Sequence, residues 1–264
     1  MSGLLTLRNL LWLTTTSTEI FLLVSLLRRK LQNTHAAFAI YILGTIAQSA
    51  LAAFAYMRWG ADSEVTSTVI WLSQGVLICL RFSAVVEMAR RIFAAYAGLW
   101  SLAKRVLGVI ALGVVAYSVL APKKDIYTMV LNLDRGLELA IATFVVCLLL
   151  FARFYLLPVE PLDRALAIGF SMYSCFYVVN DTLFEKLVNS YLQLWGYLDI
   201  LTFLASLLIW TNAVLAYSAV ASASGGPGRV PPGLYGSLSP ELNVRLKQLN
   251  DQLSQFLRAE KQRS

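Results

Sequence analysis

The sequence predicts an all-α integral membrane protein, built as a bundle of seven transmembrane helices. The chain is 58% hydrophobic and only 14% charged, whereas a soluble domain is about half apolar and about a quarter charged. Its apolar residues form successive runs, each close to the roughly 20 residues that a helix needs to cross a bilayer. A soluble core in 264 residues could not bury this much apolar surface, but a bilayer accepts helices that are apolar on every side.

Charged clusters and prolines mark the boundaries of these runs. Three basic residues at 28–30 end the first run, Lys104 and Arg105 precede the fourth, and Pro158 ends the fifth. The first run lacks a small-residue cleavage site, so we expect it to be retained as a span rather than removed as a signal peptide. The expected spans are residues 10–27, 36–56, 67–89, 106–121, 136–157, 165–187 and 194–220, all within a membrane domain of residues 1–221.

The distribution of basic residues predicts the orientation. With the N-terminus outside and the C-terminus in the cytoplasm, sixteen of the 22 Lys and Arg residues lie on the cytoplasmic side and six lie outside. Leaving out the C-terminal tail and the deeper Arg81 still leaves nine against six. Cytoplasmic loops carry an excess of Lys and Arg, so we expect this orientation in a multi-pass protein of the bacterial inner membrane.

The C-terminal region has a different composition. Residues 222–238 are rich in Gly, Pro and Ser and predict a flexible linker. Ser239, Pro240 and Glu241 then form a helix start, which predicts a cytoplasmic amphipathic helix over residues 239–264. This helix either rests on the membrane surface or the bundle, or it binds a cytoplasmic partner or a second copy of the chain. Its apolar residues follow a heptad spacing: Leu242, Leu246, Leu249, Leu253 and Phe256.

Two ionisable residues lie deep within expected spans. Glu19 follows a run of Thr and Ser in the first span, and Arg81 lies in the third. A charge inside a membrane is costly and marks a functional site with a partner. We therefore expect a buried polar pair between Glu19 and Arg81, which is either a structural bridge or part of a functional site.

A second group of polar and aromatic residues lies toward the outer half of several spans. Carboxylates and aromatic rings from different helices favour a pocket that opens outward and binds a cationic or amine-bearing ligand. The alternative is that the aromatic side chains lie at the membrane interface and the acids are hydrated. The residues of this hypothetical pocket are Glu138, Asn180, Asp181, Asp199, Tyr177 and Trp71.

Several classes of function lack support in the sequence. The net charge of +7 comes from basic residues beside apolar runs rather than from a single groove or helix face, which argues against nucleic-acid binding. The expected span 194–220 has no lysine for a retinal Schiff base, and His35 is the only histidine. Cys79, Cys147 and Cys175 lack metal-ligand spacing. We therefore expect no catalytic residues, no metal site and no cofactor.

The predicted function is that of a non-enzymatic sensor or receptor-like membrane module. In topology alone, the chain resembles the seven-helix input regions of bacterial sensor kinases, which implies a sensing role. No kinase or cyclase motif follows the membrane region, so any signal would pass to a partner in trans. Two alternatives remain open: a small-solute or cation- or proton-coupled transporter with three helices on each side of a central one, or an accessory subunit of a membrane complex.

Overall fold

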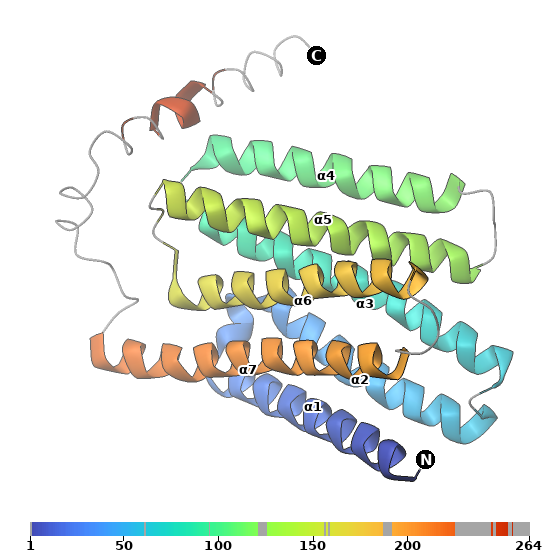
Figure 1. Cartoon of the computed structure of the whole chain (residues 1–264). Helices are drawn as coiled ribbons and strands as arrows, with labels where there is room; N and C mark the ends of the chain where they lie inside the picture. The colour runs from blue at the N-terminus through green and yellow to red at the C-terminus, as the bar shows by residue number, and fades with distance from the viewer. Residues whose placement is uncertain are drawn as a thin grey trace.

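The computed structural model describes residues 2–60, 62–94, 96–120, 126–155, 157, 159–186, 192–224, 244, 247–252 and 255. Within these residues all regular secondary structure is helical. Seven long helices, joined by short connections, run back and forth along one direction (Figure 1). They are α1 (Ser2–Arg28), α2 (Ala36–Trp59), α3 (Glu64–Ile92), α4 (Ala97–Leu120), α5 (Ile126–Phe154), α6 (Pro161–Lys186) and α7 (Leu192–Ser224), with a short 3₁₀ turn η1 (Leu31–Asn33) between α1 and α2.

Six of these helices are long and apolar enough to cross a membrane, so the chain is a multi-pass helical membrane protein. The helix that is not among the six is α6, which has Asp163 and Arg164 in its first turn and further charged residues at its other end. We expected seven spans, and six helices qualify as spans by length and composition. The candidate spans are Asn9–Arg28, Ala36–Trp59, Glu64–Ile92, Gly98–Leu120, Met129–Phe154 and Gly196–Tyr217.

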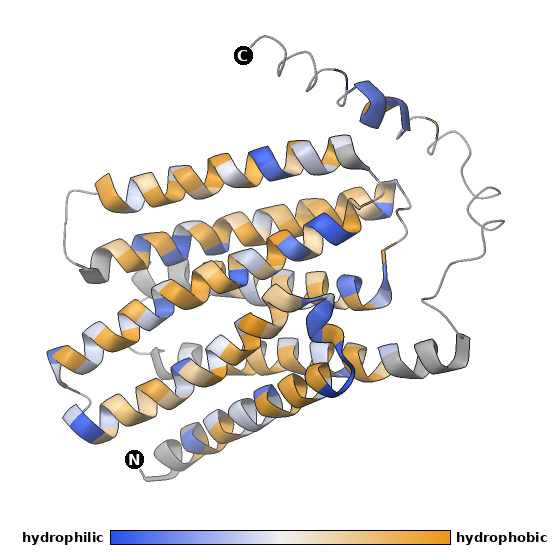
Figure 2. Ribbon diagram, turned by 180° about the vertical axis from the view of Figure 1, so that it is seen from behind, coloured by the Kyte–Doolittle hydropathy of each residue, from blue (hydrophilic) through white to orange (hydrophobic). Residues whose placement is uncertain are grey.

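Apolar side chains cover the outside of the bundle. Met57 is 81% exposed, Leu112 is 71% exposed and Leu150 is 65% exposed. Figure 2 shows that hydrophobic residues predominate along the helices. Patches of this kind are unusual on a soluble monomer, whereas a lipid environment accommodates them.

Helix contacts define a ring with α4 outside it. Each of α1, α2, α3, α5, α6 and α7 packs against the next in that order, and α7 returns to α1. α4 packs mainly on α5 at the edge of the bundle (Figure 1). α1, α3, α5 and α7 all end at the same end of the bundle, where α2, α4 and α6 begin. We call this the basic end, because the last turns of α1, α3 and α5 carry arginines.

Three helices begin well before their expected spans. α1 begins at Ser2 rather than at residue 10, α4 at Ala97 rather than at residue 106, and α5 at Ile126 rather than at residue 136. Hydropathy detects the apolar middle of a helix, while the backbone hydrogen bonds continue through charged residues such as Lys104 and Asp134. α7 continues to Ser224, past the expected start of the linker. Residues 225–243 lie outside the described residues.

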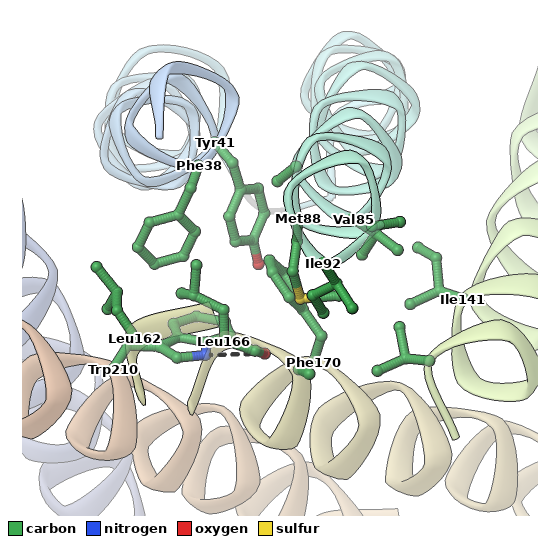
Figure 3. Close-up of a cluster of buried hydrophobic side chains, with 14 of the residues drawn as sticks. Phe38, Tyr41, Val85, Met88, Ile92, Ile141, Leu162, Leu166, Phe170 and Trp210 are labelled. Atoms are coloured by element: carbon green, nitrogen blue, oxygen red, sulfur yellow. Dashed lines mark hydrogen bonds between the residues drawn. The ribbon is translucent and has the colours of Figure 1, made fainter. Parts of the chain in front are cut away.

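Four aromatic residues form the centre of the hydrophobic core near the basic end. We call Phe38, Tyr41, Phe170 and Trp210 the aromatic plug; each is at most 1% exposed. The Phe38 and Trp210 rings lie 5.2 Å apart edge to face, and the Phe170 and Trp210 rings lie 4.9 Å apart. Figure 3 shows these rings among apolar side chains from α3, α5 and α6. Edge-to-face contacts of this kind stabilise a core beyond the burial of area alone.

A glycine allows α6 and α7 to approach closely at the plug. A Cβ atom at Gly169 would lie 2.2 Å from Nε1 of Trp210, so no larger residue fits without a shift of the indole. The Trp210 indole N–H donates to the backbone carbonyl of Leu166 at 3.4 Å, drawn as a dashed line in Figure 3. The Ser206 hydroxyl donates to the carbonyl of Gly169 at 3.1 Å. Small residues at helix crossings are typical of membrane bundles.

The variant Gly169→Ala tests this close packing. The added methyl group would displace the buried Trp210 ring, and overpacking of this kind costs about 1–3 kcal/mol. We expect a lower midpoint of thermal unfolding in detergent. The control is Gly108→Ala on α4, where nothing lies within 4 Å of an added Cβ; its midpoint should not fall. Equal midpoints for the two variants would contradict the packing described for α6 and α7.

Candidate functional site

An arginine lies buried in the middle of the bundle. Arg81 of α3 is 4% exposed and forms an ion pair with Glu138 of α5, whose side chain is fully buried. Its Nε donates to the hydroxyl of Tyr41 at 3.2 Å. The guanidinium carbon lies 4.5 Å from the centre of the Tyr173 ring and 5.5 Å from that of Tyr41. An arginine at this depth needs a counter-charge and further polar contacts, and three neighbouring helices provide them.

A second carboxylate lies one helical turn from Glu138. Asp134 of α5 accepts hydrogen bonds from the hydroxyl of Tyr177 and from Nε2 of Gln74, the latter at 3.3 Å to each carboxylate oxygen. The Gln74 Oε1 atom accepts in turn from Nε2 of Gln48 at 3.0 Å. A continuous polar network therefore links α2, α3, α5 and α6 at one level of the bundle, where each satisfied contact offsets the cost of burial.

A cavity of about 210 Å³ lies beside this network. Two carboxylates from opposite ends of the chain face it, Glu19 of α1 and Asp199 of α7. Oε2 of Glu19 and Oδ1 of Asp199 have no hydrogen-bond partner among the described residues, and Glu19 is only 2% exposed. The described residues that line the cavity are Trp12, Thr15, Thr16, Glu19, Thr45, Gln48, Ser49, Gln74, Leu77, Arg81, Tyr173, Asp199, Ile200 and Phe203.

The charges of the cavity lining are unequal. Arg81 is the one basic residue among the described lining residues, and Glu138 already supplies its counter-charge. Glu19 and Asp199 therefore lack a basic partner within that lining. An ionised carboxylate in an apolar interior is very costly unless a cation or a hydrogen-bond donor lies against it. The cavity is thus suited to a positively charged or hydrogen-donating guest.

The aromatic plug lies between the cavity and the basic end. Along α2, which starts at the basic end, Phe38 and Tyr41 precede the lining residue Thr45. Along α7, which ends there, Trp210 follows the lining residue Phe203. The plug is the layer between the cavity and that end. Tyr41 belongs to the plug and also accepts from Arg81, so the polar network and the plug share a residue.

Ion pairs hold three helix ends together at the basic end. Asp163 of α6 accepts from Nε of Arg91 on α3 at 3.1 Å and lies 3.1 Å from Nε2 of His35, just before α2. Arg91 also donates to Glu160 at 3.0 Å. Glu87 of α3 accepts from the first backbone N–H groups of α2, at 3.0 and 3.3 Å. A carboxylate at a helix N-terminus satisfies N–H groups that have no partner within the helix.

Part of the C-terminal region contacts the bundle. The Asn250 Oδ1 atom accepts from the backbone N–H of Gly98 at the start of α4, at 2.9 Å. Leu249 is partly buried against the hydrophobic core, and residues 247–252 are helical. The other heptad positions, Leu242, Leu246, Leu253 and Phe256, lie outside the described residues. The described segment therefore contacts the bundle rather than standing free of it.

The residues proposed from the sequence fall in different places. Arg81 and Glu19 line the same cavity, but the ion pair of Arg81 is with Glu138, whereas we expected Glu19 as its partner. α3 packs on α5, and the spacing of charges along a sequence does not indicate which helices are neighbours.

The expected outward pocket is only partly represented in the cavity lining. Asp199 lines the cavity, whereas Glu138 and Tyr177 are not among its lining residues. Glu138 forms the ion pair with Arg81, and the hydroxyl of Tyr177 donates to Asp134. Trp71 of α3 is partly buried and is not among the lining residues. Asn180 and Asp181 belong to α6, but their side chains lie outside the described residues.

The sequence analysis missed Asp134 and Tyr41. Asp134 precedes Glu138 by one helical turn and Gln74 precedes Arg81 by two, so each pair lies on one helix face. The sequence signal that could have identified Asp134 is this placement of polar residues on one face of an otherwise apolar helix. The pairing of His35 with Asp163 joins segments that are 128 positions apart, and no local pattern indicates it. Among the described residues, no group of three or more His, Cys, Asp and Glu side chains could hold a metal ion.

No protein-family model matches the chain, and no curated protein or solved structure is significantly similar to it. The function therefore has to be argued from the geometry of the bundle.

Removal of Arg81 tests whether its ion pair organises the site. Arg81→Met leaves Glu138 buried without its counter-charge, and breaking a buried pair on one side costs about 3–5 kcal/mol. We expect a large fall in the midpoint of thermal unfolding. The double variant Arg81→Met/Glu138→Leu, which removes both charges, should recover most of the loss. A single variant as stable as the double variant would show that the pair does not form.

Proposed function

We propose that the chain is a non-enzymatic, receptor-like membrane module that binds a small cationic or amine-bearing ligand in the mid-bundle cavity. The observation that carries this proposal is the pair of carboxylates, Glu19 and Asp199, that face one cavity with an unpartnered oxygen each. Arg81 does not neutralise them, because its charge is matched by Glu138. A cation in the cavity would offset the cost of leaving these two carboxylate oxygens buried without a partner.

The size and walls of the cavity narrow the ligand class. A volume of about 210 Å³ is below the roughly 300–1,000 Å³ of sites for drug-sized ligands, which favours a small solute. The rings of Trp12 and Phe203 lie in the wall and offer cation–π contact to an ammonium group. Thr15, Thr45 and Gln48 add hydrogen-bonding groups. This set suits an ammonium ion or a small amine.

The aromatic plug supports a receptor over a conduit. Its four rings are buried and pack against one another on the side of the cavity that faces the basic end. A packed layer therefore separates a ligand in the cavity from that end. Two features at the basic end offer surfaces to which a partner could bind. One is the ion-pair cluster of His35, Arg91 and Asp163, and the other is the contact between Asn250 and Gly98. A signal would pass to a partner protein in trans, with the helix at 239–264 or its heptad residues as the contact.

The proposal includes a seven-span topology in the inner membrane, with the basic end in the cytoplasm. α6 lies between α5 and α7 and also contacts α3. Its buried residues Asp163, Tyr173 and Ser174 therefore face other helices rather than lipid. The arginines of the basic end agree with an excess of positive charge on the cytoplasmic side.

Thiol labelling tests this topology. In a cysteine-free background, single cysteines replace Asn33, Asp62, Pro161 or Asn189. We expect a membrane-impermeant maleimide to label positions 62 and 189 in intact cells, and positions 33 and 161 only after permeabilisation. Labelling of positions 161 and 189 from the same side would show that α6 does not cross.

Ligand binding is tested with tetramethylammonium as the probe and an equal concentration of sodium chloride as the ionic-strength control. A saturable rise in unfolding temperature is expected, corresponding to about 2.7 kcal/mol at 100 times Kd. Glu19→Gln and Asp199→Asn should abolish the rise without lowering the stability of the ligand-free protein, because each removes a charge with a buried oxygen that has no hydrogen-bond partner among the described residues.

The matched control for these variants is Asp62→Asn, at an exposed position outside the cavity. It should respond to the probe as the wild type does. An equal response of Glu19→Gln, Asp199→Asn and the wild type would contradict binding in this cavity.

A second candidate function is transport, which the order of the helices favours. If α1, α2 and α3 are matched with α5, α6 and α7, the contacts α1–α2, α2–α3 and α1–α7 correspond to α5–α6, α6–α7 and α3–α5. α4 then links two similar halves, and such repeats are common in transporters. Under this matching the buried carboxylates Glu19 and Glu138 lie on corresponding helices.

Flux into proteoliposomes separates the two candidates. A receptor binds methylammonium without moving it, so wild type and Glu19→Gln would both show no flux above that of empty liposomes. Uptake by the wild type that Glu19→Gln abolishes would replace the receptor proposal with transport.

A further inference from the structure

A second and larger cavity lies at the basic end, away from the polar network. Its volume is about 530 Å³, and it is bounded by the end of α3, the last turns of α5, the connection to α6 and the first turns of α6. Ile92, Leu148 and Leu157 form a buried apolar floor. Leu150 and Ile168 form part of its wall and are 65% and 40% exposed. The groove therefore opens on the apolar outer surface of the bundle.

Two arginines line this apolar groove. Arg153 lies in the last turn of α5 and Arg164 in the first turn of α6, and both are exposed. The nearby acids Glu160 and Asp163 are already paired with Arg91. Within the part of the chain that the structure describes, neither Arg153 nor Arg164 forms an ion pair. An apolar groove thus carries two positive charges at a helix-terminal level without a matching acid.

We infer that this groove binds an anionic phospholipid, with the headgroup phosphate at Arg153 and Arg164 and an acyl chain along the floor. Helix termini lie at the level of the lipid headgroups when the apolar middles span the hydrocarbon. Guanidinium groups bind phosphate through charge-assisted hydrogen bonds, and basic pockets between membrane helices bind anionic headgroups. A neutral partner helix would leave both arginines without a counter-charge. This site is separate from the mid-bundle cavity and does not depend on the proposed function.

A lipid bound in this groove would stabilise the basic end of the bundle. The groove is formed by the same connection that carries Glu160 and leads into α6, whose Asp163 binds Arg91 and His35. A lipid bridging Arg153 and Arg164 would tie the last turn of α5 to the first turn of α6 beside this ion-pair cluster. Protein purified with the lipid is therefore expected to unfold at a higher temperature than delipidated protein.

The test measures retention of phosphatidylglycerol and phosphatidylcholine by purified protein in mixed micelles, using native mass spectrometry and thermal unfolding. The wild type should prefer phosphatidylglycerol. Arg153→Gln and Arg164→Gln should each weaken that preference by about fivefold, as expected for one basic residue near an anionic headgroup. The control variants are Arg28→Gln and Arg90→Gln, exposed arginines of the same end that do not line the groove; they should keep the preference.

Two further experiments distinguish binding of a lipid from binding of a free anion and from nonspecific attraction by positive charge. Inorganic phosphate should not stabilise the wild type, and equal stabilisation by phosphate would overturn the assignment to a lipid. Ile168→Trp narrows the groove at a partly exposed position without changing any charge, and it should reduce lipid retention while the protein still folds. Equal losses in the groove and control arginine variants would also overturn the proposal, because they would reflect net charge alone.

Discussion

The buried guanidinium of Arg81 sets the main constraint on the middle of this bundle. A positive charge at this depth is tolerated only with a counter-charge and with its N–H groups engaged. Glu138 supplies the charge from α5, Tyr41 accepts a hydrogen bond from α2, and the Tyr173 ring of α6 lies against the guanidinium. One side chain thus ties α3 to three other helices. The position of Asp134, one turn from Glu138 on α5, follows from the same arrangement and extends the network to Gln74 and Tyr177.

The arrangement around Arg81 also divides the bundle into two halves with different chemistry. On one side lies a small cavity with two carboxylates that Arg81 does not neutralise, and on the other lies the aromatic plug. Apolar packing resists deformation, and such interiors tend to respond by discrete rearrangement rather than by gradual change. Because Tyr41 contacts Arg81 and also the rings of Phe170 and Trp210, a change in the charge of the cavity would reach the plug through direct contacts. This physical link is what a receptor-like role requires.

Hydropathy was sufficient to predict the helical class and the approximate position of every long helix, because each helix contains a long apolar run. It placed the starts of α1, α4 and α5 too late, since charged residues such as Arg8 in α1, Lys104 in α4 and Asp134 in α5 interrupt the apolar run after the helix has begun. The depth of ionisable residues pointed to Glu19, Arg81, Glu138 and Asp199. It could not identify Glu138 as the partner of Arg81, because several acids lie at similar depths and the choice depends on which helices are neighbours. The contacts of His35 with Asp163 and of Asn250 with Gly98 join distant segments, so only the folded structure brings them together.

The central claim is that Glu138 is an ionised counter-charge to Arg81 inside the membrane domain. Infrared difference spectroscopy of the wild type and Glu138→Gln, with ¹³C-labelled glutamate to assign the bands, tests it most directly. The ion pair predicts that the variant loses a carboxylate stretching band and that no carboxylic-acid carbonyl band disappears. Loss of a carboxylic-acid carbonyl band instead would show that Glu138 is neutral, and would contradict the ion pair on which the arrangement of α2, α3, α5 and α6 depends.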